Sequence, residues 1–469
     1  MSKQISYKQK LTLNALATIL IMPLGLISVP IYTKSLSSSD YGMFTFFFTV
    51  INFTQPFIGL GTGTSFSRDF SRLNSLLQSK SYFTVFNFKL LNSILFASIF
   101  LLFNQLFQIL PSEIENISLL IIGYFLVLPI EPLQNRFLRV AGKIKLLSLV
   151  KICEAYIYVF IAYFVLVIFD RGISEILIAL LLAHLLRIIL IQLKVSEIIG
   201  FDIKIFDKKL LKEYLKFGLS TLPSSLSTFI VDLTDRFIIV FFLGTKELAY
   251  YTVAYSLMFI PKFSSNILNF ILFEEYNQLR FKKQIDKANE LIKNSIEIFL
   301  FTTLGCYPII LFFGQRIIAI FSSEEYSENS FIPTNILFFG FIFFGLYSLL
   351  NKILLSEGNK KVLIKTWVIA LPINIIINIS FVKTYGIIAA STATLISYMI
   401  IFIYSLHKSK FKDFGFKLKW DEIIIPIILI ITMGTLKLLG LDLLSWIASF
   451  IYLLGLGYFI LFKKLKNFS

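Results

Sequence analysis

The chain alternates between long apolar runs and short polar segments along its whole length. A helix of about 20 apolar residues is long enough to cross a hydrocarbon core of about 30 Å. The pattern therefore predicts an all-α polytopic membrane protein with 14 transmembrane helices. The predicted spans are residues 11–31, 42–62, 82–109, 117–135, 146–168, 173–193, 216–243, 248–275, 294–321, 331–354, 362–382, 386–406, 422–438 and 443–462.

Lysine and arginine are distributed unevenly among the loops between these spans. Cytoplasmic loops of membrane proteins carry an excess of both residues. If the N-terminus is cytoplasmic, the cytoplasmic loops hold most of the basic residues, for example within 136–145 and 280–293. The outside loops then hold only Lys34, Arg171, Lys246 and Lys383. The distribution predicts an even number of crossings, with both termini in the cytoplasm.

The composition agrees with a membrane protein. The chain is 57% hydrophobic with a mean hydropathy of +0.80, and only 15% of its residues are charged, compared with about 25% in soluble proteins. The net charge of +16 would suit a nucleic-acid partner, but the basic residues follow the topology, so no nucleic acid is expected. Cys153 and Cys306 lie in apolar runs, where we expect small buried side chains and neither a disulfide nor a metal site.

Three short patterns occur twice in the same order, each pair six spans apart. Residues 135–147 match 351–363, residues 36–45 match 243–252, and Gly172-Ile173 matches Gly386-Ile387. An offset of six spans gives both copies the same orientation in the membrane. The repeat predicts two six-helix lobes around a central cavity, with two extra C-terminal helices outside the repeat.

The repeat also divides the chain into domains. We expect an N-terminal lobe at 1–200 with spans 1–6 and a C-terminal lobe at 217–407 with spans 7–12. Between them, residues 201–216 carry apolar side chains on one helical face and lysines on the other, which predicts an amphipathic cytoplasmic linker helix. Residues 408–469 are expected to form an interfacial segment followed by spans 13 and 14.

Two stretches resemble a known family. Residues 13–61, with Asn14, Pro23 and Pro30, look like the start of the Wzx-type polysaccharide flippases, and residues 217–244 resemble the opening of their second half. That family belongs to the multidrug/oligosaccharidyl-lipid/polysaccharide (MOP) exporter superfamily, which also contains lipid II flippases and MATE drug exporters.

The resemblance implies that the protein translocates an undecaprenyl-pyrophosphate-linked oligosaccharide from the inner to the outer leaflet by alternating access. The cargo would be a repeat unit of O-antigen, as in lipopolysaccharide, or of capsule or exopolysaccharide. It also implies a bacterial cytoplasmic (inner) membrane, membrane lipids as partners, and contact with a polysaccharide polymerase of the same pathway. No cofactor and no metal are implied.

Two other classes of function remain as alternatives. A MATE-like exporter of small molecules, or a lipid II flippase, would share the architecture and differ in the cavity. A membrane glycosyltransferase or polymerase is a weaker alternative, because the outer loops are short and Asp40 is the only acidic residue in the first of them. No phosphate-binding glycine-rich loop with a lysine is present in the sequence. We therefore expect neither an enzyme nor catalytic residues.

Ionisable residues inside spans are costly, so each one is a functional candidate. Lys262 follows Pro261 near the middle of span 8, where a cation would suit a pyrophosphate in transit. The alternative is a structural lysine paired with a carboxylate. Arg236 in span 7 could assist Lys262. The predicted substrate-binding residues are Lys262, Arg236, Arg187 and Lys151.

Acidic residues in the spans are candidates for ion coupling. They are Asp232 and Asp235 in span 7 and Glu154 in span 5. Asp232 and Arg236 have the i,i+4 spacing of a helical ion pair, so helix packing is an equal alternative.

Short spacings also suggest pairing within single helices. Lys151 with Glu154, and His184 with Arg187, are spaced i,i+3, and local pairing or snorkelling is slightly favoured over a substrate contact. Arg136 could meet an incoming pyrophosphate, although loop charge bias alone explains it. Lys89 is expected to snorkel to a span end.

Overall fold

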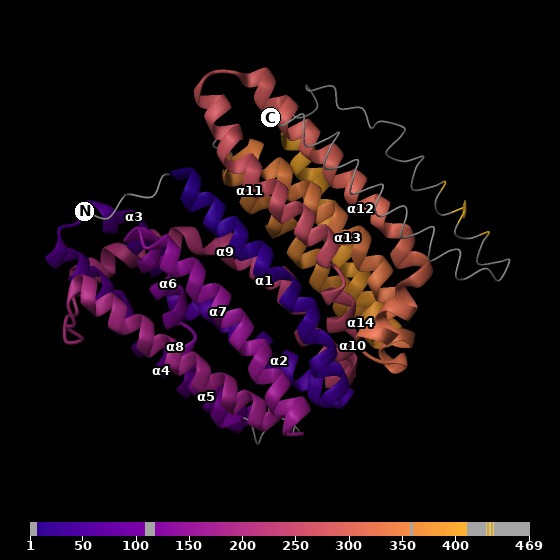
Figure 1. Cartoon of the computed structure of the whole chain (residues 1–469), viewed down its shortest axis with the longest axis horizontal. Coiled ribbons are helices and arrows are strands. Elements are labelled where there is room, and N and C mark those ends of the chain that lie inside the picture. The colour runs from indigo at the N-terminus through magenta and orange to yellow at the C-terminus, as the bar shows by residue number, and fades with distance from the viewer. Residues whose placement is uncertain are drawn as a thin grey trace. The chain divides into compact units, whose positions relative to one another are not determined.

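The computed structural model describes residues 7–107, 118–356 and 360–409, together with residues 428, 431, 432 and 435. Every regular element in these ranges is a helix, as Figure 1 shows. The chain divides into two compact units, Met1–Phe237 and Ile238–Ser469. Apart from those four single residues, the predicted spans 13 and 14 lie outside the described residues.

Unit 1 contains the predicted spans 1–6 and most of span 7. Its helices are α1 (Tyr7–Ser35), α2 (Ser38–Gly59), α3 (Thr62–Asp69), the 3₁₀ turn η1 (Phe70–Arg72), α4 (Ser75–Phe107), α5 (Ser118–Val127), α6 (Ile130–Val140), α7 (Ile144–Ala162), the π-helical turn η3 (Tyr163–Ile168), α8 (Ile173–Ile199) and most of α9 (Lys208–Leu243). In this unit α5 packs against α4 and α8 (Figure 1).

Unit 2 contains the end of α9 and the predicted spans 8–12. Its helices are α10 (Thr245–Ser256), α11 (Phe259–Phe281), α12 (Ile285–Phe321), α13 (Glu324–Ser356) and α14 (Lys360–Lys408). The segment α14 covers two predicted spans, and Gly386 interrupts its helical geometry with φ 61° and ψ −149°. Only glycine adopts such a conformation readily, which explains why a glycine stands at the turn between spans 11 and 12.

Two helix breaks occur in, or at the end of, predicted spans. The second predicted span, 42–62, covers most of α2 and ends at the first residue of α3, and α2 meets the segment α3–η1 at an angle of 55°. Leu60 and Gly61 at this break have φ of 42° and 71°. The fourth span is split at Leu128–Pro129, between α5 and α6, and Pro129 begins the turn that starts α6. Proline lacks the N–H that would continue the preceding helix, so a break at this position is expected.

The helices have the length and composition of a multi-pass membrane protein. Among the described residues, six helices are long and apolar enough to cross a membrane, or seven if the bent pair α2–α3 forms one span. The apolar windows of α4, α7–η3 and α8 are 22%, 11% and 33% buried, whereas those of α12, α13 and α14 are 67%, 61% and 50% buried. The exposed apolar faces of these helices suit contact with lipid.

The three repeated patterns coincide with helix boundaries. The pair 36–45 and 243–252 covers the turns between α1 and α2 and between α9 and α10. Residues 135–147 cover the end of α6 and the start of α7, and 351–363 include the end of α13 and the start of α14. Gly172 precedes α8 and Gly386 marks the kink of α14. Each pattern thus marks a corresponding turn in each half of the chain.

The predicted linker helix differs from the expectation in its start and surroundings. Residues 201–207 are not helical, and α9 begins at Lys208 and continues to Leu243. Its apolar face packs on protein within unit 1: Tyr214 is 1% exposed, and its hydroxyl lies 2.7 Å from the Ser81 hydroxyl. Asn87 of α4 also donates to the carbonyls of Ile203 and Ile205. The segment is therefore docked on α4 at these residues.

Candidate functional site

A buried group of polar side chains lies between α6, α7 and α8 of unit 1. We call it the N-unit cluster; its members are Glu131, Glu154, Tyr158, His184 and Arg187. Glu131 of α6 and His184 of α8 form its centre, with 2.7 Å between Glu131 Oε1 and His184 Nδ1. Both residues are buried, at 8% and 7% exposed. Pro129 starts α6 and thereby turns Glu131 toward α8.

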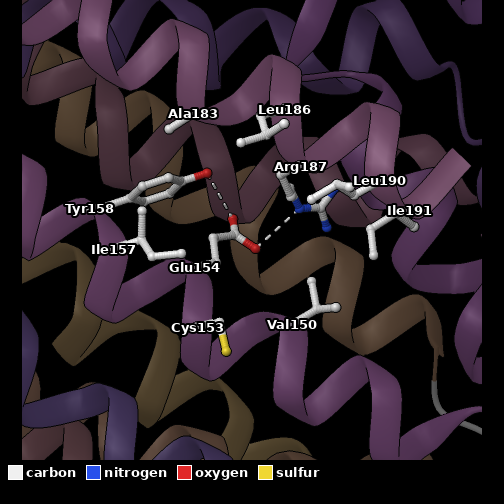
Figure 2. A pocket seen from close by; sticks show the side chains of 10 residues that line it. All are labelled: Val150, Cys153, Glu154, Ile157, Tyr158, Ala183, Leu186, Arg187, Leu190 and Ile191. Atoms are coloured by element: carbon white, nitrogen blue, oxygen red, sulfur yellow. Dashed lines mark hydrogen bonds and ion pairs between the residues drawn. The ribbon is translucent and has the colours of Figure 1, made fainter.

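α7 supplies the second carboxylate and a tyrosine. Figure 2 shows Glu154 between the hydroxyl of Tyr158 and the guanidinium of Arg187. The Tyr158 hydroxyl lies 3.4 Å from Glu154 Oε1 and 2.6 Å from His184 Nδ1. Both Glu131 and Tyr158 lie within hydrogen-bond distance of the same His184 Nδ1, so a proton on Nδ1 is shared between them, and Tyr158 in turn donates to Glu154.

Arg187 provides the fixed positive charge of the N-unit cluster. Its Nε lies 3.2 Å from Glu154 Oε2 and 3.7 Å from Glu131 Oε1. Its two terminal nitrogens donate to Gln134 Oε1 at 3.0 Å and to Asn135 Oδ1 at 2.7 Å. The guanidinium is thus held on all sides, as a buried charge requires.

The charges in the N-unit cluster do not balance without a proton. Two carboxylates face one guanidinium, so one negative charge remains when His184 is neutral and both carboxyl groups are ionised. A single proton on His184 or on either carboxyl group restores neutrality, and the hydrogen-bonded chain allows that proton to be shared. The arrangement is therefore suited to taking up and releasing one proton.

The same atoms have the spacing of a three-ligand metal site. One ligand atom each from Glu131, Glu154 and His184 lie within 4.8 Å of one another. However, the Arg187 guanidinium already contacts both carboxylates, and a divalent ion would have to displace it. The donor set therefore fits a proton better than a metal ion.

A cavity of about 180 Å³ lies beside the N-unit cluster, between α7 and α8. Glu154, Tyr158 and Arg187 form its polar side, and the remaining walls are apolar (Figure 2). Cys153 also lines this cavity and is exposed. The expectation that Cys153 is buried is therefore wrong, because its face of α7 opens into the cavity; Cys306 is buried as expected.

The charged residues of the N-unit cluster pair across helices and not within one helix. Glu154 bonds to Arg187 of α8, whereas Lys151 stays half-buried within electrostatic reach of Arg139 and Glu154. His184 and Arg187 do share one face of α8, as their spacing predicts, but each contacts Glu131 of α6. Tertiary contacts thus replace the local pairs that the i,i+3 spacings suggested.

Lys262 of α11 lies in an aromatic environment within unit 2. Its Nζ is 4.3 Å from the ring centroid of Tyr255 and 4.5 Å from that of Phe341. We call Lys262, Tyr255 and Phe341 the lysine cage. Tyr398 supports both rings, with its hydroxyl 3.3 Å from that of Tyr255 and its ring 5.5 Å from that of Phe341. Ring faces attract an ammonium group but carry no net charge to cancel it.

The polar residues of the predicted span 7 lie on α9. Asp235 is 1% exposed, and the charge of Arg236 lies close enough to Tyr41 of α2 to act on its hydroxyl. Phe237 packs edge-on against Phe46 and Phe53, also of α2. The side chain of Asp232 lies outside the described residues, so its predicted pair with Arg236 stays a prediction.

Lys89 does not snorkel to a span end. It is 6% exposed, and its Nζ donates to the carbonyl of Pro129 at 2.8 Å. The expectation was wrong because α5 and α6 are separated by a break, and the break offers a buried carbonyl near the middle of α4.

Sequence reasoning did not identify Glu131 and Tyr158 as members of a site. The apolar pattern does not show the break at Pro129, which places Glu131 in the first turn of α6. The available signal was its position two residues after Pro129 in an otherwise apolar run, where a buried carboxylate needs a partner.

A family model described as polysaccharide biosynthesis protein matches residues 33–331, more than half of the chain. An uncharacterized membrane protein of Methanocaldococcus jannaschii is 25% identical over 265 residues, covering 54% of this chain and 50% of that protein. A probable low-salt glycan biosynthesis flippase of Haloferax volcanii is 22% identical over 184 residues, or 39% of each chain. The chain thus spans half or less of the length of these curated relatives.

Comparison with solved structures identifies the fold. The lipid II flippase MurJ, in an inward closed conformation, aligns with a TM-score of 0.76 at 17% identity, covering 97% of this chain and 99% of MurJ. An inward-facing multidrug resistance MATE family transporter of the MOP superfamily aligns with a TM-score of 0.63 at 14% identity, covering 85% and 95%. At these identities the likeness concerns the fold alone. The chain belongs to the polysaccharide biosynthesis protein family and has the fold of the MOP superfamily.

Proposed function

We propose that this protein is a flippase that moves an undecaprenyl-pyrophosphate-linked oligosaccharide from the inner to the outer leaflet of a bacterial cytoplasmic membrane. The family match supports a role in polysaccharide biosynthesis, and one relative bears the name of a glycan flippase. Flippases of this kind are transporters and catalyse no covalent step. The oligosaccharide is too polar to cross the apolar core unaided, so it needs a protein path.

The lysine cage is the observation that favours an anionic cargo. Lys262 Nζ lies over the rings of Tyr255 and Phe341, so unit 2 carries a basic side chain at this position, and an ammonium group suits a pyrophosphate. A MATE-like exporter of small cations would be hindered by this same charge. The proposed substrate-binding residues are Lys262, Arg236, Arg187 and Lys151, and of these Arg187 is the most fully engaged by its own neighbours.

The transport cycle we propose is alternating access of two six-helix lobes, each exposing the cavity to one face at a time. The N-unit cluster is a candidate for coupling to a proton gradient, with Glu154 as one carrier, and Asp235 and Asp232 are the alternatives. Spans 13 and 14 would guide the polyprenyl tail in the lipid. A short crosslink between cysteines at Ser38 and Thr245 that leaves transport unchanged would exclude rocking of the lobes.

The topology proposed here has 14 crossings and two cytoplasmic termini. Cysteine or reporter labels should report outside at Glu324 and Lys383 and inside at Lys282. Labels at Glu113 and Lys412, beyond the described residues, should report outside and inside. An outside signal at Lys412 would break the alternation on which the repeat depends.

The central experiment is substitution of Lys262 in the strain that makes the polysaccharide. Lys262→Glu should abolish surface polysaccharide while the amount of protein in the membrane stays normal. Lys262→Arg should keep part of the function, because the charge matters more than the shape of the group. In proteoliposomes with a fluorescent lipid-linked oligosaccharide, the transport rate should fall in the same order, from the wild type to Lys262→Arg to Lys262→Glu. Normal polysaccharide with Lys262→Glu would exclude the proposed role, and export of small cations would favour the MATE-like alternative.

A further inference from the structure

Lys89 of α4 connects two helix breaks in unit 1. Its Nζ donates to the carbonyl of Pro129, where α5 gives way to α6. The same Nζ lies beside Gly59 at the end of α2, where a methyl group added to the glycine would be 3.7 Å away. The lysine is 6% exposed, so its charge is largely removed from solvent.

Arg136 of α6 lies beside the first of these breaks. Its side chain passes over Gly63 near the start of α3, with Cδ and Nε 3.1 Å from the position of an added methyl group. Arg136 is half-buried, and its charge is close enough to that of Lys89 for the two to repel each other. We call Lys89 and Arg136 the cation pair.

The described residues supply no anion to the cation pair. The hydrogen bond of Lys89 goes to a neutral carbonyl, and no ion pair of either residue occurs in the described part of the chain. Glu131, also on α6, is directed to His184 and Arg187 instead. Two like charges held together away from water are unfavourable, and a bound anion would remove the cost.

The backbone at the break between α2 and α3 also has features that are compatible with binding an anion. Leu60 has a positive φ of 42°, which a residue with a Cβ rarely adopts, and such strain is typical of functional sites. Gly61 is pressed against Gly218 of α9, where an added methyl group would lie 2.3 Å from a carbonyl oxygen. No side chain caps the start of α3, so its positive end faces the region of Arg136 and adds to the attraction for an anion.

We infer that the cation pair binds a phosphate oxyanion at the break between α2 and α3. A guanidinium can bind two phosphate oxygens at once, and a lysine adds a compact point charge beneath it. Arg136, being half-buried, would meet the phosphate first, and Lys89 would neutralise it at depth. The phosphate comes either from the pyrophosphate of the cargo, which rests on the proposed function, or from the headgroup of an anionic phospholipid.

Binding to the purified full chain tests this inference without a transport assay. Inorganic pyrophosphate, added at constant ionic strength, should raise the midpoint of thermal unfolding by about 3 °C when it is 100-fold above its Kd. Arg136→Gln and Lys89→Met should each weaken the apparent affinity about tenfold or more. Arg171→Gln, at an exposed position between η3 and α8, removes the same charge away from the break and should change the affinity less than threefold.

The lipid source is tested by mass spectrometry of the lipids that co-purify with each variant. Retention of phosphatidylglycerol or cardiolipin that is lost in Arg136→Gln, with no protection by pyrophosphate, would assign the site to a lipid headgroup. If Lys89→Met does not accumulate, Lys89→Arg keeps the charge and should bind like the wild type. Equal behaviour of Arg136→Gln, Arg171→Gln and the wild type in both measurements would overturn the inference and leave Lys89 as a structural contact between helix breaks. A failed transport assay with intact pyrophosphate binding would count against the flippase proposal only.

Discussion

The N-unit cluster and the lysine cage accommodate a charged side chain inside a membrane protein in different ways. In the N-unit cluster, Arg187 meets Glu131, Glu154 and two side-chain oxygens, so polar groups of the protein surround it. In the lysine cage, ring faces of Tyr255 and Phe341 lie beside the ammonium of Lys262. The first arrangement pairs a cation with carboxylates, and the second places a cation against aromatic rings.

Because of this difference, we expect substitutions at the two sites to have different effects on stability and on transport. Removing a member of a neutralised cluster leaves an opposite charge buried without compensation, which mainly affects folding. Removing the cation that lies over the two rings of the lysine cage is expected to affect mainly the recognition of an anion. We therefore expect substitutions in the N-unit cluster to lower stability more than transport, and substitutions in the lysine cage to lower transport more than stability.

The largest effect on stability is expected for Arg187→Met. The substitution leaves Glu131 and Glu154 as buried carboxylates without their cation, which should cost about 3–5 kcal/mol. We expect a clear loss of membrane-inserted protein and a lower midpoint of thermal unfolding in detergent. Adding Glu154→Gln should recover part of the loss, because one of the two uncompensated charges is then removed.

Lys194→Met on the same helix is the matched control. Lys194 forms an ion pair with Glu197, but both side chains are more than half exposed. Exposed pairs of this kind contribute about 0–1 kcal/mol, so the midpoint should hardly change. A similar response to both substitutions would show that the N-unit cluster is not a neutralised site.

The second effect concerns the lysine cage, where Phe341→Leu removes one of the two rings. A cation–π contact contributes about 0.5–2 kcal/mol, so transport should fall about threefold to tenfold while the protein stays folded. Phe338→Leu, at a buried position one turn earlier in α13, makes the same change away from Lys262. An equal loss of transport in both variants would mean that packing of α13, and not the position of the ammonium, is responsible.

Sequence reasoning predicted the helical architecture well because apolar length and loop charge are local properties. Each of the first twelve predicted spans falls largely on described helices, and the repeated patterns fall on helix boundaries. What the apolar pattern did not reveal was the break at Leu128–Pro129, whereas the break at Leu60–Gly61 lies at the predicted end of the second span. A break within a span needs only one or two residues and leaves the average hydropathy of the span unchanged.

The candidate sites were harder to predict for a related reason. Lys262, Arg187 and Glu154 stood out as charges in apolar runs, but their partners lie on other helices or are aromatic. Tyr158 and Phe341 carry no signal in a chain with 21 Tyr and 52 Phe. Spacing along one helix identifies residues on one face, and only the packing of helices shows what that face meets.

The third effect concerns the proton that the N-unit cluster is suited to bind. His184→Gln keeps hydrogen-bonding groups beside Glu131 and Tyr158 but removes one protonation site of the cluster. If the cluster couples transport to protons, the pH profile of transport in proteoliposomes should become flatter, with about a twofold to fivefold loss at its optimum. His407→Gln, at the only other histidine, should keep the wild-type profile. An unchanged profile in His184→Gln would place coupling elsewhere, with Asp235 as the next candidate.

The smallest effect is expected at the partly exposed ion pair of Lys80 and Asp207, which serves as a comparison for the ion pairs of the N-unit cluster. Lys80 Nζ lies 2.7 Å from Asp207 Oδ2, and Asp207 also accepts from the amides of Lys209 and Leu210 at the start of α9. The bond to Lys80, followed by the amide of Leu210, lowers the pKa of Asp207 to about 2. Because the unfolded pKa is higher, about 3.9, this stabilisation is complete above that value and is lost as the pH falls through about 2.

Asp207→Asn keeps the oxygen that accepts from the amides and removes only the charge, whereas Asp207→Ala removes both. At pH 7 we expect the asparagine variant to unfold about 1 °C below the wild type and the alanine variant somewhat lower. On acidification toward pH 2 the difference between aspartate and asparagine should vanish, because the carboxyl group is then protonated, while the alanine deficit remains. A constant difference across this range would show that the charge of Asp207 contributes nothing. The stability contribution of the Lys80–Asp207 pair could then not serve as a comparison for that of the ion pairs of Arg187.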